Sequence, residues 1–250
     1  MKKKYSAFTL AEVLITLTIL GVVAAITLPV LLDNVNKNAW TNGLKVAKGN
    51  IESAIANMMA DYSADSLSDT PIWADSTTKW TEGDEYTQPT EYKAYDIASL
   101  QKYFKIDSVT EGIDYDIYTL NNEKTSIANP GTRFNLTNNS SFNMFITQNA
   151  DGVDTSTAAD CGNIICAEYA KVYIDVNGKK GPNTFGKDIY SFSLSEHGRL
   201  VPYGSEALNK LNNTPTWQTD CSGNHPESTW NSEACTARVI DEGYKINYLK

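Results

Sequence analysis

Between Val13 and Leu32 the chain has 20 consecutive residues without a charge. A helix needs about 20 mostly apolar residues to cross the hydrocarbon core of a bilayer. Lys2, Lys3 and Lys4 precede this run, and lysines flanking a membrane helix favour the cytoplasmic side. The sequence therefore predicts one membrane-spanning helix near the N-terminus, with everything after residue 33 outside the cytoplasm.

Glu12 stands at the start of the apolar stretch. A lone carboxylate inside a membrane costs on the order of several kcal/mol, so an acid at this place is a functional hypothesis that requires a partner. An amine on a neighbouring helix is the partner that would neutralise it, and such a buried pair also fixes the register between packed helices.

Residues 7–13, Ala-Phe-Thr-Leu-Ala-Glu-Val, resemble the cleavage and methylation motif of type IV prepilins and type II secretion pseudopilins. The resemblance implies that prepilin peptidase removes a leader, Met1–Ala7, and that Phe8 becomes an N-methylated N-terminus. Glu12 is then the fifth mature residue. Pro29 is the twenty-second, where the family commonly has a helix-bending proline. Ala7 stands where the family usually has Gly.

The resemblance also implies a fold and a role. We expect an α+β protein in which a long N-terminal helix packs against an antiparallel sheet, and a subunit that assembles with other pilins or pseudopilins. Its place would be a bacterial inner membrane, and later a filament in the periplasm or at the cell surface. Known members serve surface pili, DNA uptake and the secretion piston. A mature chain of 243 residues favours a minor or specialised subunit.

Two other interpretations of the N-terminus remain open. A secretory signal peptide also has a basic start and an apolar centre, and Val23-Ala24-Ala25 is a candidate cleavage site. Against it, Glu12 comes early and the apolar run continues for seven residues beyond Ala25. An uncleaved membrane anchor is the other alternative.

The helical pattern continues past the membrane segment. An apolar stripe with helical spacing predicts one helix from Phe8 to about Tyr62, roughly 80 Å long. Its first part, residues 8–32, would be the membrane and assembly half, and 33–62 would be an amphipathic half packed under the sheet. The stripe consists of Trp40, Leu44, Ala47, Ile51, Ile55, Met58 and Tyr62.

Residues 63–250 are predicted to form the extracytoplasmic head, beginning with a long acidic surface loop at 63–96. A short helix is expected at Ile97–Phe104, and Asn177-Gly178 is a strong hairpin turn signal. The expected strands are Ile113–Leu120, Arg133–Thr137, Phe142–Thr147, Lys171–Val176, Ile189–Leu194 and Ala237–Ile240.

The four cysteines, Cys161, Cys166, Cys221 and Cys235, all lie in the predicted extracytoplasmic part. An even number of cysteines outside the cytoplasm favours disulfides, and four allow three connectivities. We expect the nearest-neighbour pairing, Cys161 with Cys166 and Cys221 with Cys235.

The segment from Asp175 to Asp188 is the only weak candidate for a metal. Asp175-Val-Asn177-Gly178 begins like a calcium loop, but the closing Glu of an EF-hand is absent. Some members of the resembled family bind calcium in their C-terminal region. A glycine-rich turn with an acidic shoulder accounts for the same residues, so no cofactor is predicted beyond this calcium candidate.

No pattern for an enzyme emerges. The two histidines, His197 and His225, stand outside any H-E-x-x-H pattern, and no G-x-S-x-G or Walker loop is present. A net charge of −9 argues against a nucleic-acid partner. The predicted function is therefore a structural filament subunit. The alternatives are a membrane-anchored binding protein that does not polymerise and a secreted hydrolase.

Overall fold

The computed structural model divides the chain into two compact units, Met1–Ala39 and Trp40–Lys250. Residues 73–96, Cys161 and Cys166 fall outside the described residues, so the predictions on the acidic loop and the first cysteine pair lie largely beyond them. The structure describes residues 9–72, 97–127, 131–146, 168–195, 197–205, 217–221 and 229–249.

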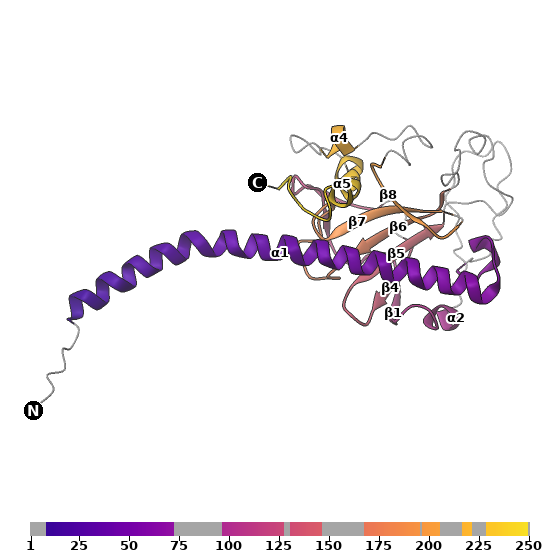
Figure 1. Cartoon of the computed structure of the whole chain (residues 1–250), viewed down its shortest axis with the longest axis horizontal. Helices are drawn as coiled ribbons and strands as arrows, with labels where there is room; N and C mark the ends of the chain where they lie inside the picture. The colour runs from indigo at the N-terminus through magenta and orange to yellow at the C-terminus, as the bar shows by residue number, and fades with distance from the viewer. Residues whose placement is uncertain are drawn as a thin grey trace, which may run out of the picture. The chain divides into compact units, whose positions relative to one another are not determined.

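A single helix, α1 (Leu10–Tyr62), contributes to both units (Figure 1). Its end has a physical cause: Ser63 adopts a left-handed conformation with φ of 51°, and its N–H bonds to the carbonyl of Ala60. The N–H of Ala64 then reaches the carbonyl of Met59, which completes a Schellman motif and stops the helix.

The predicted stripe forms the buried face of the second half of α1. Leu44, Ala47, Ile51, Ile55 and Met58 are buried, with Thr41 and Ala54 beside them. Only the two ends of the stripe differ: Trp40 is half-buried against the core and Tyr62, in the last turn, is exposed. The periodicity therefore identified the face that packs on the head.

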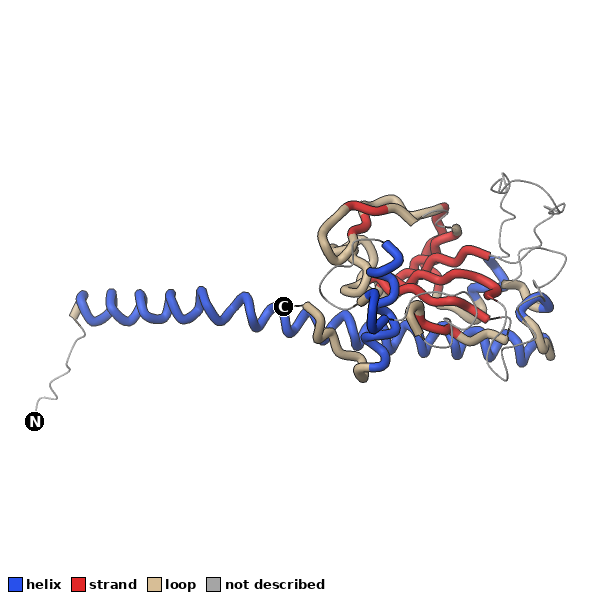
Figure 2. The backbone as a smooth tube through the Cα atoms, turned by 90° about the horizontal axis from the view of Figure 1, so that it is seen from above, coloured by secondary structure: helices blue, strands red, loops and turns tan. Residues whose placement is uncertain are grey.

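The head contains one six-stranded antiparallel sheet with the order β1-β4-β5-β6-β7-β8, together with a two-stranded ribbon of β2 and β3 (Figures 1 and 2). This confirms the α+β class with a long N-terminal helix. The main strands are β1 (Ile106–Glu111), β4 (Thr132–Leu136), β5 (Ser141–Ile146), β6 (Glu168–Asp175), β7 (Ile189–Ser195) and β8 (Leu200–Pro202); the ribbon is β2 (Ile117–Tyr118) and β3 (Lys124–Thr125).

The two faces of the sheet have different chemistry. The face toward α1 is apolar, with Phe134, Phe142, Val172 and Phe192 in one cluster with the stripe. Alternate residues of a strand point to opposite faces, so Lys171 lies on the other face. There its Nζ is 2.8 Å from a carboxylate oxygen of Glu233 in α5 (Thr229–Asp241). The polar face is thus covered by α5, which contacts β7 and β8.

Four of the six expected strands are present, each within three residues of its predicted bounds; of the other two, one is much shorter than expected and the other is a helix. Only Ile117–Tyr118 of Ile113–Leu120 is a strand, because Ile113 and Tyr115 pack as loop residues against a small second cluster. Residues 237–240 belong to α5, a helix in which Ala237 and Val239 are both buried although they point to different sides.

Other short elements complete the head. The expected helix at Ile97–Phe104 is α2 (Ile97–Gln101), followed by a turn that buries Phe104. A single 3-10 turn, η1 (Leu67–Asp69), follows α1, and α4 (Trp217–Asp220) precedes Cys221. The edge strand β1 was not predicted, because only Ile106 of its six residues is buried and no apolar alternation marks it.

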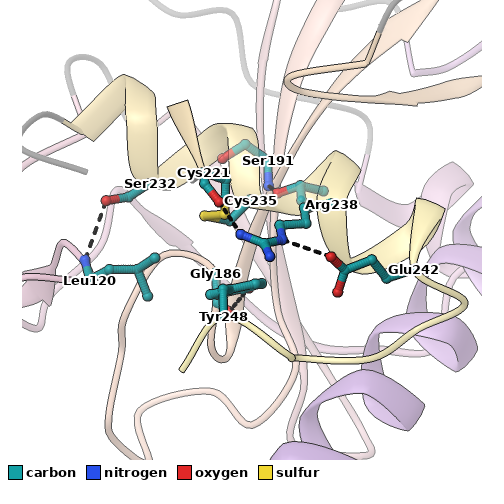
Figure 3. The surroundings of a disulfide bond; sticks show 10 residues. Leu120, Gly186, Ser191, Cys221, Ser232, Cys235, Arg238, Glu242 and Tyr248 are labelled. Carbon is teal, nitrogen blue, oxygen red and sulfur yellow. Dashed lines mark hydrogen bonds and ion pairs between the residues drawn. A yellow bond between two sulfur atoms is a disulfide. The ribbon is translucent and has the colours of Figure 1, made fainter. Parts of the chain in front are cut away.

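A disulfide joins Cys221 to Cys235 and so ties α4 to α5 (Figure 3). Arg238 of α5 donates to the carbonyl of Cys221 and, at 2.8 Å, to Glu242. Gly186 lies directly beneath the disulfide: its φ is +78°, and a Cβ there would be 2.9 Å from that of Cys235. The bond therefore docks onto the turn between β6 and β7, and only glycine fits at the contact.

Replacing Leu44 by alanine should lower the free energy of unfolding by about 2–5 kcal/mol, since a fully buried leucine is lost from the α1–sheet core. The matched control is Val46→Ala on the same helix. Val46 is 55% exposed, and its truncation should change stability by less than about 0.5 kcal/mol. Denaturant unfolding of the purified chain in detergent, followed by near-UV circular dichroism, measures both. Equal effects of the two changes would contradict the assigned core face.

Candidate functional site

The N-terminal part of α1 is exposed along its whole circumference. Every residue from 9 to 36 is exposed, including 13 Val, Leu and Ile side chains between Val13 and Leu32. Burying such side chains contributes about 1.5–3 kcal/mol each, on the order of 20–40 kcal/mol for the set. This helix is long and apolar enough to cross a membrane. A membrane or neighbouring apolar helices are therefore the environments that suit it.

The hydroxyl groups within this apolar helix are satisfied by its own backbone. Thr16, Thr18 and Thr27 donate to the carbonyls of Val13, Leu14 and Val23 at 2.8–2.9 Å. Internal hydrogen bonds remove the need for water at these positions. Pro29 also lies within the helix and has no N–H for the preceding turn, which is tolerated in membrane helices.

Glu12 forms a capping box with Thr9. One carboxylate oxygen of Glu12 accepts the backbone N–H and the hydroxyl of Thr9, both at 2.8 Å, while the N–H of Glu12 donates to that hydroxyl oxygen at 3.2 Å. The two side chains thus each accept one backbone N–H that the start of a helix would leave unpaired. This role was not predicted from the sequence, although Thr9-Leu-Ala-Glu12 has the spacing of a capping box.

In the head, the turn between β6 and β7 is built around two buried carboxylates. One oxygen of Asp175 accepts the N–H groups of Asn177 and Gly178, at 3.1 and 2.7 Å. The oxygens of Asp188 accept the N–H groups of Asn183 and Thr184, at 2.9 and 2.7 Å. Both carboxylates therefore fold the turn by capping its backbone.

Asp175 also belongs to a buried polar cluster with Tyr115 and Arg133. The hydroxyl of Tyr115 donates to the second oxygen of Asp175, and the guanidinium of Arg133 stacks 4.5 Å above the Tyr115 ring. Burial raises the pKa of Asp175 to about 7 and also raises the pKa of Asp188. In both cases the cause is the cost of placing a charge away from water.

These contacts bear on the calcium candidate formed by Asp175, Asn177 and Asp188. Both carboxylates accept N–H groups of their own turn, as expected for a glycine-rich turn that acidic side chains stabilise. Among the described residues no three His, Cys, Asp or Glu side chains gather as metal ligands would. The calcium interpretation therefore gains no support from the described head.

The described residues also give no support to a hydrolase centre. Cys221 is joined to Cys235 and is not available as a thiolate nucleophile. His197 places its Nδ1 3.1 Å from the carbonyl oxygen of Asp65, a contact to backbone rather than to a nucleophile. His225 lies outside the described residues.

We expect stability to fall as the pH rises from about 4 to about 7. The pKa of Asp175 is higher in the folded chain than in the unfolded one, where it is about 3.9. Across that interval the folded state binds more protons, so raising the pH favours unfolding. Asp175→Asn keeps an acceptor for the turn but cannot ionise, and its unfolding midpoint should depend less on pH than the parent's.

Thermal unfolding in detergent at several pH values measures this difference. Asp116→Asn is the control, since Asp116 is exposed and pairs with Lys124 at 2.8 Å. Parallel curves for the parent and Asp175→Asn would contradict the assignment.

Comparison with known proteins gives a match at the N-terminus. Residues 2–28 match the family model described as the prokaryotic N-terminal methylation motif. No curated protein and no solved structure matches the chain. The matched residues include Glu12 of the capping box and most of the uncharged run in α1. The chain therefore carries, on a helix able to cross a membrane, the N-terminal signature of type IV prepilins and pseudopilins.

Proposed function

We propose that the chain is a structural subunit of a type IV pilus or a type II secretion pseudopilus. The observation that carries this proposal is the methylation motif at residues 2–28, placed on a helix whose exposed surface is apolar on all sides. In a filament, neighbouring copies of the same helix would cover that surface after it leaves the membrane. The helix thus suits the membrane before assembly and a helical bundle afterwards.

Processing and assembly would follow the motif. Prepilin peptidase would cut between Ala7 and Phe8 and methylate the new amine, with the head on the extracytoplasmic side. Cleavage removes three lysines and leaves 18 bases against 30 acids, a formal charge of −12. With 243 mature residues and this acidic balance, we infer a minor or specialised subunit.

The proposed assembly contact is an ion pair between Glu12 and the Phe8 amine of a neighbouring subunit. The capping box supports it in one respect: it orients the Glu12 carboxylate at the first turn of the helix. A carboxylate has two oxygens and about four lone-pair sites, so capping leaves capacity for an amine. In a low-dielectric bundle, such a pair is costly to break from one side.

The mature chain should begin at Phe8. Prepilin processing keeps the apolar helix, whereas signal peptidase would cut near Ala25 and discard most of it. Terminal-peptide mass spectrometry of the membrane fraction should find Phe8 first, carrying one additional methyl group. A chain that begins at Ile26 and is free of the membrane would overturn the filament proposal, and an intact Met1 would indicate a plain anchor.

Glu12→Gln should reduce incorporation into filaments without lowering the amount in the membrane. Glutamine also completes a capping box, so this change removes the charge while keeping the local hydrogen bonds. Thr9→Ala is the reciprocal variant, since it removes the hydroxyl of the cap but keeps the carboxylate.

We expect Glu12→Gln to impair assembly more than Thr9→Ala, as measured by sheared-filament yield against membrane-fraction yield. Normal incorporation of Glu12→Gln would favour the alternative function, a membrane-anchored binding protein that does not polymerise.

A further inference from the structure

A polar pocket of about 460 Å³ opens on the head, where the end of the sheet meets two turns. Its walls come from β1, from the turn between β4 and β5, and from the turn that follows β6. Gly178 and Asn139 hold the two turns together: a Cβ at Gly178, whose φ is +66°, would be 2.6 Å from the carbonyl oxygen of Asn139. We call this cavity the Arg133 pocket. Its main polar residues are Ser108, Asp114, Arg133, Asn177, Lys179 and Lys180.

Arg133 is a buried cation whose hydrogen-bonding capacity is not filled. Its side chain is 2% exposed, and its Nε and Nη1 atoms have no hydrogen-bond partner within the described part of the chain. The nearest carboxylates, Asp114 and Asp175, are each 3.9 Å away, beyond a normal hydrogen bond. A buried donor without an acceptor lowers stability, so the site favours the arrival of an acceptor.

The charge around Arg133 favours an anion. The pocket is lined by three bases, Arg133, Lys179 and Lys180, against two acids, Asp107 and Asp114, although the whole chain has 30 acids and 21 bases. Asp175, behind the guanidinium, is occupied by the N–H groups of its turn and by the Tyr115 hydroxyl. Its raised pKa further reduces the negative charge beside Arg133 near neutral pH.

Asp114 marks the place where an anion would lie. It is 58% exposed, approaches Nη1 of Arg133 at 3.9 Å, and pairs with the ammonium group of Lys179. A carboxylate from the same chain thus stands between the two cations that an external oxyanion would use. Because Asp114 is exposed and follows the end of β1, its side chain can swing out to solvent.

We propose that the Arg133 pocket binds the carboxylate or phosphate group of a small ligand. Arg133 would donate from the pocket floor in the fork geometry that suits both groups. Lys179 and Lys180 would attract the anion at the mouth, and Asp114 competes with it. The pocket lies wholly within the head, so this binding is independent of the filament role.

The test uses the full-length chain in a neutral detergent with ¹⁵N-labelled arginine. The chain has arginines at 133, 199 and 238, so the Nε–Hε region holds few signals. Signals are assigned with Arg133→Lys and Arg199→Lys. Sodium phosphate and sodium acetate are titrated separately, with chloride keeping the ionic strength constant so that screening does not change. A saturable shift of the Arg133 signal is expected, and the effective anion identifies the ligand class.

Charge variants with matched controls test the arrangement by calorimetry without altering Arg133. Asp114→Asn should tighten binding and Lys180→Gln should weaken it, each by about threefold, as expected for partly exposed charges. Asp116→Asn and Lys124→Gln make the same charge changes outside the pocket and should leave affinity unchanged. The absence of saturation with both anions, or equal effects of Asp114→Asn and Asp116→Asn, would overturn the proposal.

Discussion

One helix presents two different surfaces along its length, and the packing of the head depends on the second of them. From Val13 to Leu32 exposed apolar side chains surround the helix, whereas from Trp40 onward the buried side chains occupy one side. One continuous helix can carry both surfaces, because its backbone N–H and C=O groups bond to each other in water and in apolar surroundings alike. The one-sided half then supplies the surface on which the sheet is built, and that half ends where the Schellman motif closes at Ala64.

The head is held together on its other side by polar contacts that converge on one turn. Asp175 and Asp188 cap the turn between β6 and β7, Tyr248 donates to the carbonyl of Gly186, and Cys235 packs on Gly186. The C-terminal segment is thereby tied to strands that lie more than 40 residues earlier in the chain. Folding therefore explains Gly186, Asp175 and Asp188 in the turn between β6 and β7, and none of these residues requires a metal.

The elements that were predicted correctly from the sequence share one property, a clear periodicity of their apolar residues. Apolar residues recur with helical spacing in the stripe of α1 and alternate with polar residues in the central strands. The pattern alone therefore predicted which segments are helix and which are strand. The edge strand β1 buries only Ile106, and α5 takes its burial from contacts with β7 and β8 that no local pattern encodes. In the sites, Glu12 was found from its position but its capping partner Thr9 was not. Arg133 was missed, because its neighbours Tyr115 and Asp175 lie 18 and 42 residues away in the sequence.

The family match is confined to residues 2–28, and this has a physical reason. In the proposed filament subunit, peptidase recognition, passage through a bilayer and helix packing would all act on the same 27 matched residues, so several demands would restrict each position there. The head lies outside the matched residues, and part of its surface is built by turns. Arg133 of β4 is a buried cation with two of its own donors, Nε and Nη1, unpaired, and this arrangement costs stability that apolar packing would not. A function of the head, separate from filament assembly, is the simplest account of that cost.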